Sequence, residues 1–333
     1  MNRREVLQLG VSSLSCVAAA AAVGSAAFPA RADDWPTKNF RVIIPYAAGS
    51  ATDLVPRTIF EAVGHQLGRS FIVENRVGGG TTVGATAVAR ADPDGYTILG
   101  HSNAIVTVPA IQPSVPYDPV KDFSAITPLG NVPLVLVIAP EKNVKTVQQL
   151  VAAAKAKPGS ITYAAAGIGT PPHLTAERFR LAAGFEGLLV PFKGAPEALT
   201  EVLTGRVDFY FCPMPVALPF VDQGRLLALA VGGSKRAVAL PNVPTTVEAG
   251  FPNSDFDFWV GAFVPKATPR DVVAKLHRAT VAAIESAAVK EKLAKLGVEP
   301  MLMSPQDFEA RIAREVDIAV KLAKAANITP QSQ

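Results

Sequence analysis

The sequence predicts an α/β fold with two lobes and a cleft between them. Short apolar runs alternate with stretches of helical periodicity, and this alternation is typical of parallel sheets with helices on both faces. Two strongly apolar runs are each followed by a proline, and they divide the chain into an opening part, a middle part and a tail. The opening and middle parts each contain a strand, a glycine-containing loop and the start of a helix.

The individual elements follow from residue spacing. Apolar and β-branched runs predict strands, whereas an apolar residue at every third or fourth position predicts a helix. The expected strands are 41–44, 71–74, 97–100, 134–139, 161–165, 188–191, 207–211, 226–231 and 259–264. The expected helices are 53–67, 82–90, 147–156, 173–183, 197–204, 215–223, 270–286, 289–296 and 305–325.

Two crossings between the lobes are expected where the apolar runs 134–138 and 259–263 lead to Pro140 and Pro265. A chain that enters a second lobe and then returns would cross at these points. We therefore expect lobe 1 to comprise residues 33–134 and 258–333, and lobe 2 to comprise residues 135–257.

The loop 45–53 lies between the apolar strand 42–44 and a helix. Its residues are small, and we expect Thr52 or Asp53 to cap the helix and Pro56 to fall within the first turn. A helix N-terminus presents unpaired N–H groups and the positive end of the helix dipole. The loop is therefore a candidate anion site, and the alternative is a turn that only reverses the chain.

A second loop of the same kind follows the strand 161–165. Gly167, Gly169 and Thr170 precede two prolines and a helix that is expected to begin near His173. If the two lobes face each other, two helix N-termini meet across the cleft. They would then offer opposed N–H groups to an anion, without any Arg or Lys.

Residues 1–32 have the features of an export signal. Arg3 and Arg4 precede an apolar, alanine-rich run, and small residues up to Ala32 suit a signal peptidase. The paired arginines favour twin-arginine export, with ordinary secretion as the near alternative. A retained membrane span is disfavoured because polar and small residues interrupt the run, and the residues before Cys16 do not fit a lipoprotein signal. We expect cleavage near Ala32.

Composition argues against several classes of protein. Residues 1–32 carry three Arg and one Glu, so the net charge falls from +4 to +2 without them. No basic block indicates nucleic-acid binding. Cys212 is the one cysteine left after processing, so no intramolecular disulfide can form. The four histidines lack metal-ligand spacing and no Gly-Lys pair of a P-loop occurs, so we expect neither metal nor cofactor.

An enzyme is the rival interpretation. Residues 100–104 resemble the G-x-S-x-G elbow of serine hydrolases, with Ser102 as the nucleophile. An elbow needs a helix directly after the serine, but residues 105–108 are all β-branched and Pro109 follows, so a good helix is not expected there. His277, the plausible late histidine, lies in a helical pattern and suits a surface position. We therefore expect no catalytic residue.

Short motifs along the chain resemble one family. They lie at 35–36, 41–46, 49, 52–53, 73–76, 92–97, 116–119, 121–123, 172–174, 193–194, 217–219, 240–245 and 248–250. The chain is similar to the tripartite tricarboxylate transporter receptors, the Bug or TctC family of extracytoplasmic solute-binding proteins. The resemblance implies a type II periplasmic-binding-protein fold, a Venus flytrap in the periplasm that closes on a small carboxylate. It also implies delivery of that ligand to the membrane permease subunits of the transporter.

In that family the loops that match 46–53 and 167–173 hold the ligand, largely through backbone amides, hydroxyls and ordered water. The expected ligand-binding residues are Tyr46, Ala48, Gly49, Ser50, Thr52, Asp53, Ser102, Asn103, Gly167, Gly169, Thr170, His173 and Cys212. For each of them the alternative is a turn, cap or core role, and residues 193–194 are interpreted as an exposed turn. We expect a monomer that binds a di- or tricarboxylate or an aromatic carboxylate, and no nucleic acid. A receptor that reports its ligand to a sensor protein is an alternative.

Two departures from the family pattern bear on specificity. Residues 47–51 are poorer in Gly and Pro than the family loop. Cys212 stands where many relatives carry an Asp that could pair with a ligand amino group. Its loss favours a plain carboxylate, and the alternative for Cys212 is a buried, inert thiol. Tyr46, Phe192 and Trp259 are either ring contacts for the ligand or core residues.

Overall fold

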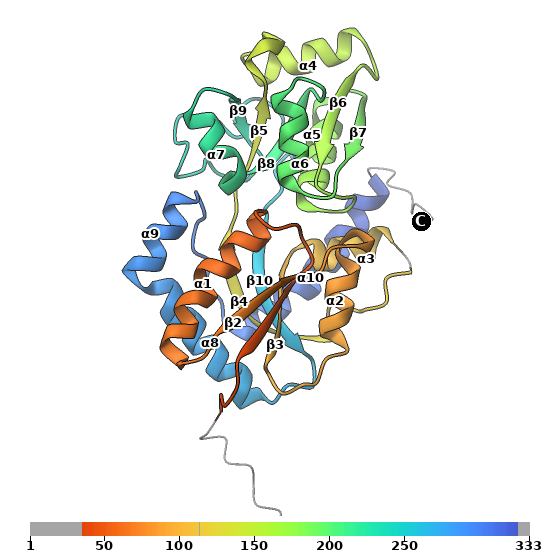
Figure 1. Ribbon diagram of the computed structural model, residues 1–333. Helices are drawn as coiled ribbons and strands as arrows, with labels where there is room; N and C mark the ends of the chain where they lie inside the picture. The colour runs from red at the N-terminus through yellow and green to blue at the C-terminus, as the bar shows by residue number, and fades with distance from the viewer. Residues whose placement is uncertain (1–34, 113, 326–333) are drawn as a thin grey trace, which may run out of the picture. The chain divides into compact units, whose positions relative to one another are not determined.

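The computed structural model describes residues 35–112 and 114–325, and Figure 1 shows their helices and strands. The described residues from Pro36 onward form one compact unit. The predicted export signal and its cleavage near Ala32 lie outside the described residues. Within the compact unit the named strands form two five-stranded sheets.

The first sheet is built from the opening and tail parts of the chain. Its strands are β1 (Phe40–Ile44), β2 (Phe71–Asn75), β3 (Thr97–Ser102), β4 (Phe123–Asn131) and β10 (Trp259–Pro265), in the order β2-β1-β3-β10-β4. β1 pairs in parallel with β2 and β3, whereas β10 is antiparallel to β3 and β4. The helices of these parts are α1 (Ala51–Leu67), η2 (Gly79–Thr81), α2 (Thr82–Ala89), α3 (Ala104–Ile111), α8 (Arg270–Glu285), α9 (Ala287–Lys295) and α10 (Pro305–Ala325).

The second sheet comes from the middle of the chain. Its strands are β5 (Leu134–Ile138), β6 (Ile161–Ala165), β7 (Gly187–Pro191), β8 (Phe209–Pro213) and β9 (Leu227–Val231), in the order β7-β6-β8-β5-β9. β6 is parallel to β7 and β8, and β5 is antiparallel to β8 and β9. The helices are η3 (Pro140–Lys142), α4 (Val147–Ala156), α5 (Pro171–Ala183), α6 (Ala195–Leu203) and α7 (Met214–Asp222).

The α/β class is confirmed, but the expectation of parallel sheets is wrong in part. Both sheets are mixed, because β10 and β5 enter their sheets antiparallel to their neighbours. These are the two apolar strands that border the crossings. A strand that arrives directly from the other sheet has no crossover helix, so nothing forces it to run parallel to its neighbours.

Helix α3 contradicts the expectation that no helix follows Ser102. Its β-branched residues and Pro109 lower its intrinsic propensity, but six of its eight residues are buried. A helix that is apolar all round is stabilised by packing rather than by propensity. The packing of α3 against α10 supplies that stabilisation, and no pattern within residues 104–111 reveals a partner so distant in sequence.

Strand β4 was not expected at all. Its sequence contains Pro128 and Gly130, which are unfavourable inside a central strand. β4 is an edge strand, and its pairing with β10 shifts register between Val260 and Gly261, where Pro128 and Gly130 lie opposite. An irregular edge accommodates a missing N–H that a central strand would not.

The two sheets are joined by two crossover segments, 132–133 and 232–258, which Figure 1 shows between β4 and β5 and between β9 and β10. Val132 N–H donates to the Phe258 carbonyl at 2.7 Å, and Gly232 N–H donates to the Leu134 carbonyl at 2.7 Å. The crossovers therefore run together where the chain passes between the sheets. The exact lobe boundaries 33–134, 135–257 and 258–333 stay a prediction.

Candidate functional site

The loop after β1 is closed by a bond from its own helix. Gly49 has a φ of +78° and directly precedes Ser50, which is the N-cap of α1. Asp53, the third helical residue, accepts the Gly49 N–H at 2.9 Å through Oδ2. The expected cap is therefore corrected to Ser50, and Pro56 lies beyond the first turn, inside the helix. The carboxylate of Asp53 fixes the loop rather than pointing freely from it.

The other oxygen of Asp53 is also occupied. Asp53 Oδ1 accepts from Arg57 Nε at 2.8 Å and from Asn75 Nδ2 at 2.8 Å. The same Asn75 amide donates to the Tyr46 carbonyl at 2.9 Å. Asp53 is buried, and Arg57 is partly exposed. Arg57 therefore offsets the negative charge that Asp53 brings to the N-terminus of α1.

A hydroxyl pair connects this loop to the end of β3. The Tyr46 hydroxyl and Ser102 Oγ are hydrogen-bonded at 2.6 Å, and Ala104 N–H donates to Ser102 Oγ at 3.1 Å. Burial raises the pKa of Tyr46, so the phenol is neutral. Asn103 Nδ2 donates to the Asp257 carbonyl at 2.9 Å. The strand ends that carry these three predicted residues are thus tied to each other and to the second crossover.

The loop after β6 repeats the geometry of the first loop. Gly169 has a φ of +79° and precedes Thr170, the N-cap of α5. His173, the third helical residue, accepts the Gly169 N–H at 3.0 Å through Nδ1. Thr170 Oγ1 donates to the Gly167 carbonyl at 2.7 Å. In each loop a glycine is therefore followed by the hydroxyl residue that caps the helix, then by two further residues, and then by the side chain that accepts the glycine N–H.

The second loop meets the first sheet directly. Thr107 Oγ1 of α3 donates to the Gly169 carbonyl at 2.6 Å. A Cβ on Gly169 would lie 3.2 Å from Val108 Cγ2, so only a glycine lets the loop come this close to α3. Thr107 was not among the predicted residues, because its role depends on contact with the other sheet.

The start of α6 lies against the first loop, which sequence reasoning also missed. A Cβ on Gly194, the N-cap of α6, would be 2.8 Å from Ala47 Cβ, and one on Gly49 would be 4.0 Å from Pro196 Cγ. Gly194 is buried although Lys193 is exposed, so the interpretation of both residues as an exposed turn is wrong for Gly194. The glycine at position 194 was the feature of the sequence that could have indicated this close approach.

Exposure separates the predicted residues into three groups. Ala48 and Gly49 are exposed, Gly167 is half-buried, and the remaining loop residues are buried. Ser50 Oγ and Asn103 Oδ1 are buried without a hydrogen-bond partner in the described part of the chain. Such atoms need water or a ligand group to satisfy them.

Cys212 lies in the core rather than on the surface of the molecule. It is fully buried in the core of the second sheet, among residues of β5 and α6 such as Val135 and Ala198. Burial raises the pKa of its thiol well above the ordinary value. The predicted alternative of a buried thiol is confirmed. Trp259 is likewise a core residue, fully buried against Phe308.

The geometry around Ser102 does not form a hydrolase centre. A helix does follow the serine, contrary to expectation, but no described histidine bonds to its Oγ. His101 Nδ1 accepts the Ser102 backbone N–H at 2.9 Å, and His277 Nδ1 lies 3.0 Å from the Ile126 carbonyl. Neither imidazole is placed to remove the proton of the serine.

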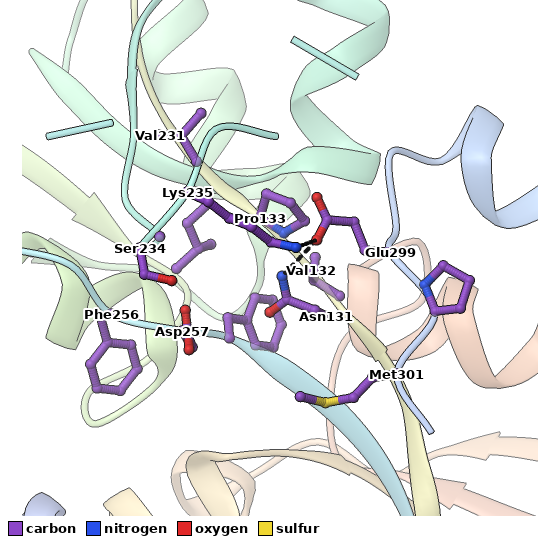
Figure 2. A pocket seen from close by; sticks show the side chains of 14 residues that line it. Asn131, Val132, Pro133, Val231, Ser234, Lys235, Phe256, Asp257, Glu299 and Met301 are labelled. Atoms are coloured by element: carbon purple, nitrogen blue, oxygen red, sulfur yellow. Dashed lines mark hydrogen bonds and ion pairs between the residues drawn. The ribbon is translucent and has the colours of Figure 1, made fainter. Parts of the chain in front are cut away.

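The pocket in Figure 2 lies at the crossovers rather than at the two loops. It has a volume of about 210 Å³, and Lys235 Nζ lies 3.3 Å from Glu299 Oε2 at its edge. In Figure 2 the Asn131 amide lies beside the same carboxylate, at 3.4 Å.

A second pocket of about 250 Å³ includes Asn103 and Thr107. Its charged lining consists of Arg178, Arg311, Asp255, Asp257 and Glu315. Acidic groups outnumber basic ones there, which does not suit an anion.

Comparison with known proteins identifies the family. The model of the tripartite tricarboxylate transporter family receptor matches residues 55–328. The chain belongs to this family of receptors. The match begins just after the first loop, so the pattern of residues 49–53 is an observation on this chain itself.

Three solved structures resemble this receptor over most of its length. Rpa4515 of R. palustris with adipate is 31% identical, with a TM-score of 0.86 over 90% of this chain and 100% of that one. The periplasmic binding protein BugD is 31% identical, with a TM-score of 0.84 over 89% of this chain and 100% of that one. MatC (Rpa3494) from Rhodopseudomonas palustris with bound malate is 28% identical, with a TM-score of 0.81 over 86% and 99%. The predicted family and the periplasmic-binding-protein fold are confirmed.

The family is one of solute-binding receptors rather than enzymes. Among the described residues of this receptor, no helix combines the length and the apolar character that a membrane crossing requires. The described residues also contain no group of three or more His, Cys, Asp or Glu side chains arranged to hold a metal ion.

Proposed function

We propose that this receptor captures a small organic carboxylate, most simply an aliphatic dicarboxylate, between the loops 46–53 and 167–173. The observation that supports it is the repeated loop geometry, one copy from each sheet, with the second copy hydrogen-bonded to α3 through Thr107 and Gly169. Two related structures contain adipate and malate, which are both aliphatic dicarboxylates. An aromatic acid or a tricarboxylate is the alternative within the same site.

The donors for such a ligand differ between the loops. The N–H groups of Ala51 and Thr52 are at the first two positions of α1, where a helix offers no internal partner. In α5 the same positions are Pro171 and Pro172, which have no N–H. The second loop therefore contributes its remaining amides, because the Thr170 hydroxyl proton already goes to the Gly167 carbonyl. Ser50 Oγ is buried without a partner and can donate to a carboxylate, whereas Asn103 Oδ1 can only accept, from water or from a ligand hydroxyl.

Thermal-shift screening of the mature protein against mono-, di- and tricarboxylates and aromatic acids tests the proposal. A ligand at about 100 times its Kd should stabilise the protein by about 2.7 kcal/mol. Gly49→Val, which places a branched side chain at a φ of +78°, should abolish the shift while the apo protein still unfolds cooperatively. A folded protein that responds to none of these acids would contradict the proposal.

Delivery to a tripartite tricarboxylate-type permease and location in the periplasm are part of the same proposal. The periplasmic relatives and the paired Arg3 and Arg4 support them. Cells that lack this receptor should lose uptake of the acid identified in the screen, and replacing both arginines by lysine should leave the protein in the cytoplasm. Normal uptake without the receptor would favour a sensing role instead.

A further inference from the structure

The helix that carries His173 also carries a buried ionic cluster. Glu177 is buried and accepts the Tyr163 hydroxyl at Oε1. Its Oε2 accepts from Arg180 Nη2 at 2.7 Å and from Arg180 Nε at 3.1 Å. His173 Nε2 lies 4.0 Å from Glu177 Oε1. The carboxylate therefore faces the side of the imidazole that is opposite Gly169.

The two sides of His173 require the same tautomer. Nδ1 can accept the Gly169 N–H only if it carries no proton. The single proton of the neutral ring must then be on Nε2, where its N–H dipole points toward Glu177. At 4.0 Å this contact is electrostatic rather than a direct hydrogen bond, but it still disfavours a lone pair on Nε2.

We propose that Glu177 is a positioning residue for the ligand loop, and that it acts by holding the His173 proton on Nε2. Nδ1 then stays available to the Gly169 N–H, and the loop keeps the shape in which the Gly169 carbonyl accepts the Thr107 hydroxyl of α3. Protonation of Nδ1 would set two N–H groups against each other and release Gly169. The effect on ligand binding rests on the proposed function, whereas the tautomer and the loop geometry do not.

The surroundings of His173 determine the pH at which its imidazole becomes protonated. Burial lowers the pKa of His173 to about 4, the Glu177 charge opposes that shift and the Arg180 charge adds to it. Tyr163 of β6 donates a hydrogen bond to Glu177, and Thr107 of α3 carries no charge. The ring is therefore neutral near pH 7, and its protonation becomes appreciable only in acid.

Long-range ¹H–¹⁵N NMR of the ligand-free protein tests the proposal without any ligand. At pH 7 we expect an unprotonated Nδ1 on His173. The Gly169 amide resonance should move with the His173 titration, at a midpoint below 6.5. A proton on Nδ1 at pH 7, or a Gly169 amide that is indifferent to the titration, would overturn the proposal.

Glu177→Gln separates positioning from a merely structural role. Removing the carboxylate should lower the His173 midpoint, because the imidazolium loses its counter-charge, and should populate the Nδ1–H tautomer at neutral pH. A structural role alone would lower the melting temperature without changing the tautomer. Should this variant fail to fold, Glu177→Asp keeps the charge but withdraws it from Nε2, and an unchanged tautomer and midpoint of His173 in that variant would overturn the positioning role.

The effect on ligand binding is tested with the variant His173→Asn and with adipate as the ligand. Asparagine Oδ1 can take the place of Nδ1, just as Asp53 Oδ2 accepts the Gly49 N–H in the first loop. The asparagine amide carries no titratable proton. We expect His173→Asn to bind more tightly than His173→Leu at pH 7, since His173→Leu loses the acceptor and about tenfold in affinity, the worth of one hydrogen bond. The affinity of His173→Asn should also depend less on pH in acid than that of wild type. Equal loss in both variants would contradict an acceptor role. If adipate does not bind to wild type, the proposed ligand class fails while the NMR result stands.

Discussion

The loops that precede α1 and α5 share one backbone design and differ in chemistry. Both place a glycine of positive φ before a hydroxyl N-cap, and both tie that glycine's N–H to the third helical residue. In the first loop the acceptor is the carboxylate of Asp53, and in the second it is the neutral imidazole of His173. Loop shape and loop charge are therefore set by separate residues in this receptor.

The two loops differ in what they can offer a carboxylate ligand. The first loop has the free N–H groups of Ala51 and Thr52, but it also has a carboxylate whose charge is offset by Arg57. The second loop brings no negative charge at its acceptor, but two prolines remove the N–H groups. Neither loop is a complete anion site by itself, which explains why the contact between the two sheets matters.

The largest expected effect concerns acid. The folded-state pKa of His173 is lowered from 6.5 to about 4, so below pH 6.5 the unfolded chain binds more protons and stability falls as pH falls. This should remove about 3 kcal/mol from the unfolding free energy by pH 4. Urea unfolding at several pH values should show that His173→Asn loses less in acid than wild type.

His101 does not disturb that measurement. Burial lowers its pKa to about 3, so it also destabilises the protein in acid, but it is present in both proteins and cancels from the difference. His65→Asn, on the exposed side of α1, is the control for loss of a histidine as such. If the unfolding free energies of wild type and His173→Asn fall in parallel from pH 7 to 4, the second loop does not depend on the neutral imidazole of His173.

The two glycines should differ in the cost of an added methyl group. Alanine at either position is strained by the positive φ, at about 1–2 kcal/mol. At Gly169 the Cβ would also lie 3.2 Å from Val108 Cγ2 and 3.3 Å from Ile111 Cδ1, whereas at Gly49 it meets only Pro196 at 4.0 Å. We expect Gly169→Ala to weaken ligand binding about a hundredfold and Gly49→Ala about tenfold. Calorimetric titration measures both, and equal losses would mean that α3 yields to the added methyl.

Exchanging the acceptors tests the role of charge. Asp53→Asn keeps an acceptor for Gly49, but it removes the ion-pair partner of Arg57 and turns a buried NH2 group toward the Arg57 and Asn75 donors. We expect a loss of about 1–3 kcal/mol of stability. Affinity for a dicarboxylate should rise several-fold, and the gain should shrink in high salt. His173→Asp should have the opposite effect on affinity. An affinity that ignores both exchanges would place the ligand charge away from these helix ends.

Local patterns predicted the fold where local contacts determine it. The ranges 147–156, 161–165 and 305–325 match the observed elements, because each has its own apolar period and clear end signals. Helix α3 and strand β4 were missed, since one depends on burial against α10 and the other on an edge position beside β10. The antiparallel entry of β5 and β10 is also a property of the whole chain.

The candidate site also has features that local sequence predicts and features that depend on contacts between distant parts of the chain. Glycine, hydroxyl and proline spacing predicted two strand–loop–helix junctions, and both are present. The acceptor bonds of Asp53 and His173 are also local, at four residues from their glycines, and could have been inferred from that spacing. Thr107 and Gly194 could not, because they matter only once the two sheets are brought together.

The smallest expected effect distinguishes the two places where the sheets meet. Thr107 is buried and donates to Gly169 at 2.6 Å, whereas the Lys235 side chain that pairs with Glu299 is 74% exposed. Loss of a buried hydrogen bond should cost binding about tenfold in Thr107→Val. Lys235→Met should cost less than about threefold and nothing in high salt, because exposed pairs are worth at most about 1 kcal/mol. The two losses should add in the double variant, since the groups share no partner. A larger, salt-independent loss for Lys235→Met would mean that the crossover side, rather than the paired loops, controls how the sheets come together around the ligand.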